Sequence, residues 1–238
     1  MDPLVFTLAK IENIMQQVTF DPQEMKGKIV TNTITVKRDF LEDVLLILYD
    51  TIANGLAVSP HIKIESVGQN TRILTACSIT IDGVLLKQGI PVRPKGGGII
   101  EVVDRLPMRF TDMLLYWATT IDPIDILMSQ ELTSVRKMME TGSGRILGNL
   151  REAPMLAREQ IEDVLELLKT SDFAGVLELG EPNMDVLGVP VERDHMGIAL
   201  VGGTNIVAAA LESGMEISTQ SISGLTDVGE MRHIEDAF

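Results

Sequence analysis

Several residue types are scarce in this sequence, and each scarcity excludes a class of protein. The 238 residues include one cysteine, Cys77, so the chain can hold neither a disulfide framework nor a cysteine zinc cluster. A single thiol is typical of a reducing compartment, and we expect a cytoplasmic location. Aromatic residues make up 4% of the chain, which argues against a base-stacking surface for single-stranded nucleic acid.

Basic residues and long apolar runs are also few. The chain has 20 Lys and Arg against 34 Asp and Glu, which gives a formal net charge of −14. A domain with this charge repels polyphosphate, and no basic stripe is visible, so the chain alone should bind duplex DNA poorly. The apolar run Val44–Tyr49 is bounded by Asp43 and Asp50, and no run reaches membrane-spanning length. The start, Met1–Pro3, lacks the basic region of a signal peptide.

Apolar residues make up 45% of the chain, and their spacing predicts both helices and strands. Helices are expected after Asp2-Pro3, from Leu41, after Asp122-Pro123, near Met155 and after Gly202-Gly203. Strands are expected at Lys28–Val36, His61–Gly68, Arg72–Ile81, Ile99–Val103, Ala174–Leu179, Gly197–Val201 and Met215–Ile222. Met113–Ala118 is interpreted as a buried strand, with a helix as the alternative. Asp82-Gly83 and Lys95–Gly98 are interpreted as turns, and the acidic C-terminal tail as mobile.

Two matches within the chain predict an internal duplication. Gly89-Ile90-Pro91-Val92, followed by Gly98-Ile99, has the same spacing as Gly188-Val189-Pro190-Val191 followed by Gly197-Ile198. Leu41–Leu45 likewise matches Ile161–Leu165. The two matches are not separated by the same distance, so the first half should hold extra residues, which the predicted strand pair His61–Ile81 can supply.

The predicted fold class is therefore α/β, with α+β as an alternative, built from two similar halves. We expect an N-terminal helix and linker at residues 1–27, a first half at 28–140 and a second half at 155–238. The glycines in 141–154 predict a flexible connecting segment. A ligand cleft is expected between the halves, because small molecules bind at such junctions.

One segment has the pattern of an anion site. Gly202-Gly203-Thr204-Asn205 follows a predicted strand and precedes a predicted helix, whose first N–H groups attract a carboxylate or phosphate. A simple capped turn explains these four residues about equally well.

Other candidate ligand contacts come from neighbouring segments. His195 lies in the charged turn Glu192–His195, where a solvated turn is the simpler interpretation. Cys77 is expected in the core of a strand, with Ser78 and Thr80 on the opposite face towards the cleft. No motif for a metal, a cofactor or a catalytic triad is visible.

Three longer blocks resemble a known family. They are Cys77–Pro91, Thr141–Arg151 and Gly188–Asn205, and in this order they resemble the effector-binding domain of the archaeal nitrogen repressor NrpR. The resemblance extends from about Ile29 to the end of the chain. It implies a repressor of nitrogen-assimilation genes in methanogens, with 2-oxoglutarate as the effector that relieves repression. The family's winged-helix DNA-binding region is expected before this domain, and Met1–Asp21 provides only one helix, so DNA contact is expected through a region absent from this chain.

A dicarboxylate that enters a protein of charge −14 needs local positive charge and N–H donors. Arg193, Arg145, Lys87 and the helix start at Gly203–Asn205 are the expected suppliers. A homo-oligomer, most simply a dimer, is expected because operators are read by two-fold symmetric proteins.

Two other functions remain open from the sequence. An enzyme acting on a small anionic metabolite would use the same cleft, but it needs a convergent acid, base or nucleophile that the sequence does not reveal. A pure dimerisation module would need no polar cleft. We expect a sensing domain without catalysis and without a cofactor.

Overall fold

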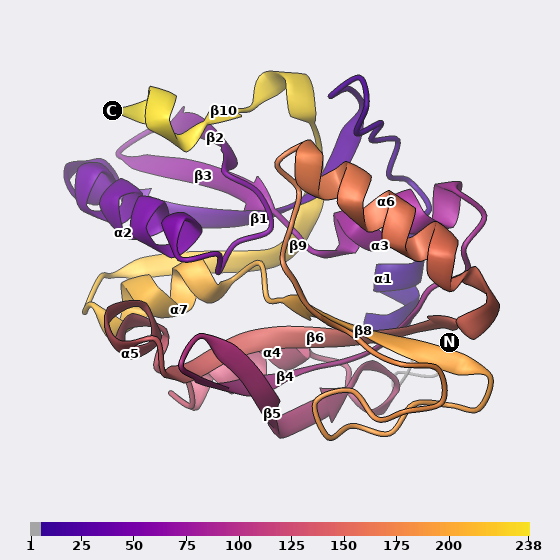
Figure 1. Cartoon of the computed structure of the whole chain (residues 1–238). Coiled ribbons are helices and arrows are strands. Elements are labelled where there is room, and N and C mark those ends of the chain that lie inside the picture. Colours follow the sequence, from indigo (N-terminus) through magenta and orange to yellow (C-terminus); the bar gives the residue numbers. More distant parts are fainter. Residues whose placement is uncertain (1–5) are drawn as a thin grey trace.

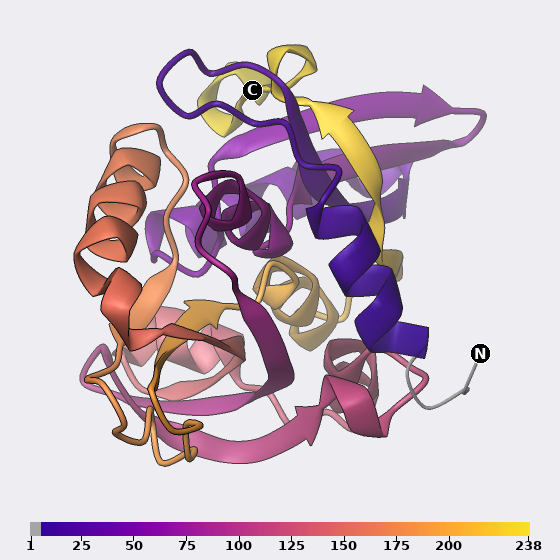
Figure 2. The same cartoon turned by 90° about the vertical axis from the view of Figure 1, so that its right-hand side faces the viewer.

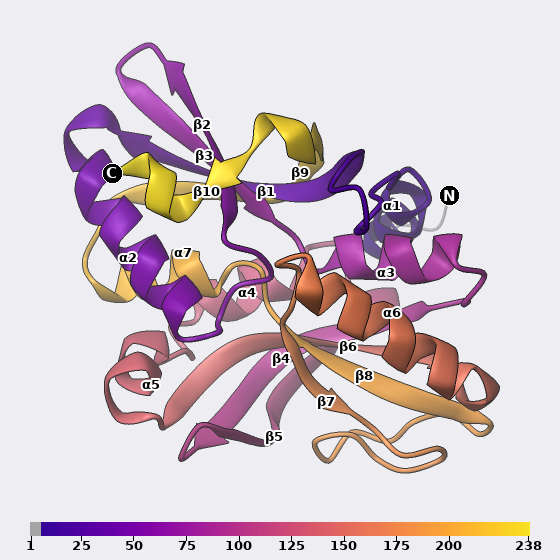
Figure 3. The same cartoon turned by 45° about the horizontal axis from the view of Figure 1, so that its top comes forward.

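Two five-stranded sheets enclose a layer of helices in this computed structural model, which describes residues 6–238 (Figure 3). Sheet 1 has the order β10-β2-β3-β1-β9, from β1 (Lys28–Lys37), β2 (His61–Val67), β3 (Asn70–Ala76), β9 (Ile217–Asp227) and β10 (Arg232–His233). Sheet 2 has the order β5-β4-β6-β8-β7, from β4 (Arg93–Val103), β5 (Leu106–Leu115), β6 (Gly144–Pro154), β7 (Val176–Leu179) and β8 (His195–Val201). All these pairings are antiparallel.

Four helices form the middle layer: α2 (Leu41–Ala53), α3 (Ile79–Lys87), α6 (Arg158–Thr170) and α7 (Asn205–Glu212). Within it, α2 packs against α7 and α3 packs against α6 (Figure 1). Helix α1 (Phe6–Met15) lies against α3 and the short turn at residues 116–118 (Figure 2), while the predicted cap Asp2-Pro3 lies outside the described residues. The short helices α4 (Pro123–Ser129) and α5 (Val135–Thr141) pack against sheet 2.

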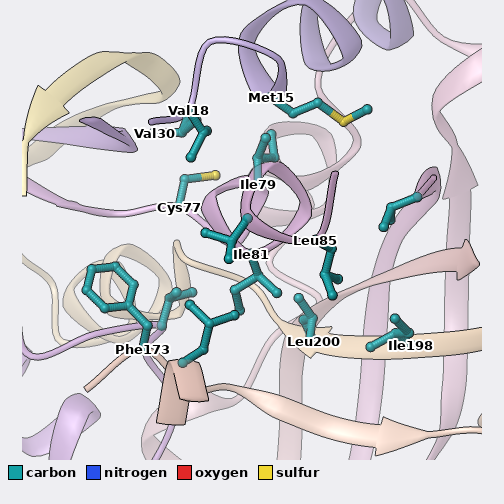
Figure 4. Close-up of a cluster of buried hydrophobic side chains, with 14 of the residues drawn as sticks. Met15, Val18, Val30, Cys77, Ile79, Ile81, Leu85, Phe173, Ile198 and Leu200 are labelled. Atoms are coloured by element: carbon teal, nitrogen blue, oxygen red, sulfur yellow. The ribbon is translucent and has the colours of Figure 1, made fainter. Parts of the chain in front are cut away.

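The core lies between the helices and the two sheets. Ile34 and Val36 of β1 point to the helices and are buried, while the alternate residues Thr33 and Thr35 are partly exposed. Figure 4 shows the core around α3, where Ile79, Ile81 and Leu85 lie among side chains of other elements, including Leu200 of β8. β1 therefore buries one face against the helices, whereas β6 and β8 of sheet 2 are buried at nearly every position.

The order of elements repeats along the chain. β1, a short turn, α2, β2, β3, α3 and β4 recur as β6, a short turn, α6, β7, β8, α7 and β9. β4 leaves its own half and pairs with β6, while β9 pairs with β1. The predicted α/β fold of two similar halves is confirmed, and each half gives its last strand to the sheet of the other.

The structure aligns the halves differently from the sequence matches. Leu41–Leu45 and Ile161–Leu165 lie in the corresponding helices α2 and α6, as expected. However, Gly89–Val92 leads from α3 to β4, whereas Gly188–Val191 leads from β7 to β8, so their equivalence is wrong. The expectation that the first half holds the extra residues is wrong as well. They lie in the second half, where residues 180–194 join β7 to β8, cross sheet 2 and bring Val186 against the strand at Gly197.

Two predicted turns are parts of regular elements. The strand predicted at Arg72–Ile81 ends at Ala76, and Asp82-Gly83 lies inside α3, where Gly83 allows Val18 to pack against the helix. Lys95–Gly98 lies in β4. Gly98 serves there for close packing, since a side chain at this position would overlap Phe110 of the next strand. The turn predictions are wrong because tertiary contacts override local preference at these glycines.

Three other segments are more ordered than the sequence indicates. Residues 144–154 form the central strand of sheet 2, so the flexibility predicted for the connecting segment 141–154 is wrong, although the division between halves stays a prediction. The strand predicted at Met113–Ala118 covers only the last three residues of β5, and its remaining residues form the turn at 116–118. The C-terminal tail is anchored by β10 and by Ile234, which is 1% exposed.

Candidate functional site

The turn from β3 to α3 and the turn from β8 to α7 meet at a small, partly open pocket. A Cβ atom at Gly203 would lie 3.0 Å from the carbonyl oxygen of Ala76, so the two turns are in direct contact. The pocket is lined by Asn32, Cys77, Ser78, Ile79, Tyr116, Asp122, Ile124, Asn149, Gly203, Thr204, Ser221 and Ile222. These residues come from both halves and from the segment that joins them.

Corresponding residues of the two halves face each other here. Asn32 lies opposite Thr75 in the β1–β3 ladder, and Asn149 lies opposite Leu200 in the corresponding β6–β8 ladder. The Cys77 N–H donates to the Val30 carbonyl (2.9 Å), and the Gly202 N–H donates to the Leu147 carbonyl (2.8 Å). The pocket therefore lies where the repeated units approach each other in an approximately symmetric way.

Thr80 and Asn205 have the same structural role in the two halves. Thr80 Oγ1 accepts from the Val30 N–H (3.0 Å) and donates to the Val30 carbonyl (3.2 Å). Asn205 Oδ1 accepts from the Leu147 N–H (2.8 Å), and its Nδ2 donates to the Leu147 carbonyl (3.0 Å). Both side chains join the start of a helix to the adjacent strand, and both are fully buried behind the pocket.

Two helices begin at the pocket. Ser78 precedes α3 and Thr204 precedes α7, and neither side chain caps its own helix. Ser78 Oγ donates instead to Asn149 Oδ1 (2.9 Å). Thr204 Oγ1 is buried without a hydrogen-bond partner in the part of the chain that the structure describes. Because the first N–H groups of a helix carry partial positive charge, these two starts offer donors to an anion.

A buried ion pair lies next to Ser78 and Asn149. Arg151 of β6 donates to both carboxylate oxygens of Asp82, from Nε (2.6 Å) and from Nη2 (2.7 Å). Its remaining contacts, at 3.4 Å, reach Asn149 Oδ1 and Ser78 Oγ. Burial opposes the charge of the guanidinium, but the paired Asp82 carboxylate outweighs this and raises the pKa of Arg151 above its usual value.

Three titratable groups face the pocket, and burial raises the pKa of each. The pKa of the Cys77 thiol rises to about 12, so the thiol is protonated at neutral pH and is not a nucleophile. The pKa of the Tyr116 hydroxyl rises well above its usual value, so it is a neutral donor. The pKa of Asp122 rises from 3.8 to about 6, although the Ile124 N–H that it accepts favours the charged form.

The opposite wall is formed by an irregular part of β9. The β1–β9 ladder shifts register between Thr31 and Thr33, and Ile222 has a φ of 50°. This left-handed conformation is strained for a β-branched residue, at a cost of about 1–3 kcal/mol. The Ile222 N–H donates to Asn32 Oδ1 (3.0 Å), which fixes the bulge and keeps Ser221 and Ile222 at the pocket.

The structure brings some of the predicted site residues together and leaves others apart. Cys77, Ser78, Gly203 and Thr204 line the pocket. Gly202, Thr80 and Asn205 lie directly behind them, with their polar groups bonded to neighbouring strands.

The predicted basic residues lie outside the pocket. The Arg193 side chain is 93% exposed, and His195 begins β8, whose seven residues place it roughly 20 Å from the Gly202 end. Lys87 ends α3 on the side away from Ser78, and Arg145 is exposed near the start of β6.

Sequence reasoning missed Asn32, Asn149, Tyr116, Asp122 and Ser221. The two asparagines carried a usable signal, because an amide in the middle of an apolar strand needs buried hydrogen-bond partners. Asp122 was identified as a helix cap, and its Oδ1 does accept from the Ile124 N–H (2.9 Å). Its place on the pocket wall depends on the path of β5 and could not be foreseen.

Within residues 6–238, no three His, Cys, Asp or Glu side chains are grouped so that they could bind a metal ion. No helix in that range is both long enough and apolar enough to cross a membrane.

Comparison with known proteins identifies the family. A model described as the NrpR regulatory domains NRD1 and 2 matches residues 4–233. The chain belongs to this family. It is 37% identical over 241 residues to the global nitrogen regulator NrpRI of Methanosarcina mazei, covering 98% of this chain and 75% of that protein. It is 32% identical over 230 residues to the global nitrogen regulator NrpR of Methanococcus maripaludis, covering 96% of this chain and 40% of that protein.

A solved structure agrees with the NrpR assignment. The crystal structure of a nitrogen repressor-like protein from Methanococcus jannaschii matches with a TM-score of 0.85 and 27% identity, over 96% of this chain and 98% of that one. The resemblance to NrpR is therefore confirmed, and the chain consists of regulatory domains found in archaeal nitrogen regulators. Membership of a family of transcriptional regulators favours a non-enzymatic role.

Proposed function

We propose that this chain is the effector-sensing part of a repressor of nitrogen-assimilation genes, and that it binds 2-oxoglutarate in the pocket between its halves. The observation that carries the proposal is the convergence of two helix starts, one from each half, beside the unpaired hydroxyl of Thr204. Helix starts of this kind bind carboxylates through their free N–H groups.

A ligand with a carboxylate at each end matches this arrangement. One carboxylate would accept from the Thr204 hydroxyl and from the N–H groups of the Gly203-Thr204 turn before α7, and the other would lie near Ser78 at the start of α3. Arg151, which is paired with Asp82, holds Ser78 and Asn149 in place behind this position. The enclosed space between the turns is only about 20 Å³, so the proposal requires the two turns to move apart when the ligand enters.

Binding at this position would affect gene control by changing how the two halves are arranged. The pocket joins the turns of both halves, so a ligand that favours one spacing of the turns also favours one arrangement of the two sheets. We propose that this change is transmitted to a DNA-binding region outside this chain. Its relatives extend beyond the matched part, since the chain spans 75% and 40% of their lengths.

Titration calorimetry with the wild-type chain tests the ligand. Thr204→Val and Ser78→Ala should each weaken binding by about 10- to 150-fold, the effect of losing a hydrogen bond to a charged group. Arg193→Ala is the matched control, because that side chain is exposed and outside the pocket. Absence of heat at millimolar 2-oxoglutarate would reject the ligand. Unchanged affinity in both folded pocket variants would keep the ligand and reject the pocket.

We also propose that the chain forms a homodimer and acts in the cytoplasm, where an archaeal gene regulator meets its DNA. Exposed apolar side chains support self-association: Leu106 and Met108 of β5 are 64% and 53% exposed. Light scattering at high concentration is the test, and a mass that stays at 26.1 kDa would overturn the dimer.

A further inference from the structure

We propose that Asp122 couples effector binding to the uptake of one proton, so that the pocket accepts a dianion only together with a proton. This inference rests on the proposed binding of 2-oxoglutarate in the pocket. It adds a residue that determines which ligand charges the site tolerates.

The geometry places an unpaired carboxylate at the anion site. Asp122 lines the same pocket as Ser78 and Thr204. Only its Oδ1 has a hydrogen-bond partner, the Ile124 N–H at 2.9 Å. Among residues 6–238, no Lys, Arg or His nitrogen forms an ion pair with Asp122. Oδ2 is therefore the oxygen that remains to take a proton or to face a ligand.

The charged and titratable groups around Asp122 are already paired, protonated or distant, so Asp122 is the group whose charge can change when a ligand binds. Asp125 on the same helix already accepts from Ser221 Oγ (2.7 Å), and Arg151 of β6 is neutralised by Asp82 of α3. Cys77 and Tyr116 are protonated at neutral pH because burial raises the pKa of both. Lys10 of α1 acts only at a distance and favours the ionised form of Asp122.

A dianion in the pocket would add negative charge beside Asp122. Burial already raises the pKa of this carboxyl to about 6, and a like charge nearby raises it further. The complex therefore binds a proton from the buffer at Oδ2, and the resulting O–H donates to an oxygen of the ligand. A ligand with an ammonium group in that place, such as an amino acid, would pair with the ionised carboxylate and would need no proton.

The test is calorimetry of 2-oxoglutarate binding at about pH 7.5 in buffers of different ionisation enthalpy, which counts the protons taken up. The wild-type chain should take up about one proton per ligand, and its affinity should fall by up to ~10-fold for each pH unit above neutrality. Asp122→Asn keeps the side-chain shape and the helix cap, and should bind with no proton uptake and little pH dependence. Asp227→Asn is the matched control, because Asp227 also caps a turn, through the Gly229 N–H at 3.0 Å, but is exposed and outside the pocket.

The outcomes separate this inference from the proposed function. Heat without proton uptake in the wild-type chain, or uptake that persists in Asp122→Asn, overturns the inference and leaves 2-oxoglutarate as the effector. No heat at any pH rejects the effector and this inference with it. Loss of uptake in Asp122→Asn but not in Asp227→Asn supports the role of Asp122.

Discussion

Asp122 is a carboxyl group that folding makes harder to ionise, and this has a consequence for stability. Its pKa rises from 3.8 to about 6, mainly through burial. The folded chain therefore binds this proton more tightly than the unfolded chain, so stability falls as pH rises from about 4 to about 6 and the penalty stays constant above that. Asp122→Asn should raise the free energy of unfolding by on the order of 1–2 kcal/mol at about pH 8 and have little effect at about pH 4.

Denaturant unfolding at the two pH values measures this difference. Asp227→Asn provides the comparison, because its carboxylate caps a turn on the exposed surface and should show no such pH dependence. An equal gain for Asp122→Asn at both pH values would show that the carboxylate carries no ionisation penalty.

Cys77 should be nearly inert in the folded chain. The thiol is 7% exposed, and burial raises its pKa to about 12. Because the thiolate is the reactive form, alkylation by iodoacetamide at about pH 8 should be at least ~100-fold slower than in the unfolded chain. Mass spectrometry of timed samples gives both rates. Labelling of the native chain at the rate of a free thiol would contradict both the burial and the raised pKa.

Among the elements, the contact between the β3–α3 and β8–α7 turns depends on Gly203. A Cβ atom there would lie 2.8 Å from Asn32 Nδ2 and 3.0 Å from the Ala76 carbonyl oxygen. Gly203→Ala should therefore separate the turns, lower the free energy of unfolding by about 1–3 kcal/mol and weaken ligand binding. Thermal unfolding with calorimetric titration measures both effects. Gly224→Ala in β9 is the control, since nothing lies within 4 Å of a Cβ there, and a similar loss in both variants would contradict the proposed contact.

The elements that the sequence predicts best are those whose apolar residues recur at a regular spacing. α2 and α6 have apolar residues at helical spacing, and their buried positions Val44, Leu48, Ile161 and Leu168 follow it. α3 was mistaken for a strand and a turn because it contains four β-branched residues and a glycine. It is buried between other elements, so packing decides its conformation, and no local pattern reveals that.

The candidate site was predicted in part for a similar reason. Strand–turn–helix order is local, so the sequence could locate Gly203 and Thr204 near a helix start, whereas Ser78 was expected on a strand face towards the cleft. The position of a charge relative to a pocket is not local. Arg193 lies in a long loop at the far end of β8, and Asp122 reaches the pocket only through the path of β5.

At the scale of the whole molecule, the exchanged strands should make unfolding cooperative. β4 of the first half pairs along β6, and β9 of the second half pairs along β1, so neither half can unfold without breaking a sheet of the other. Scanning calorimetry should give one transition, with the calorimetric enthalpy equal to the van't Hoff enthalpy. Two resolved transitions would show that the halves unfold independently despite the exchange.

The distribution of charge gives the last prediction, on DNA. The chain carries a formal charge of −14, and many of its Lys and Arg side chains are already paired with carboxylates, including Arg151, Arg158 and Lys63. Binding to duplex DNA requires several free cations that replace counterions on the phosphates, and here the net field repels them. At physiological salt the dissociation constant of this chain alone for duplex DNA should therefore be larger than ~10⁻⁴ M, the upper end of the range for ordinary non-specific binding. Fluorescence anisotropy with a labelled duplex measures it, and a full-length relative such as NrpRI of Methanosarcina mazei serves as the comparison. A tight, sequence-specific complex with this chain alone would mean that a local basic surface outweighs the net charge, and that DNA contact does not need a region outside this chain.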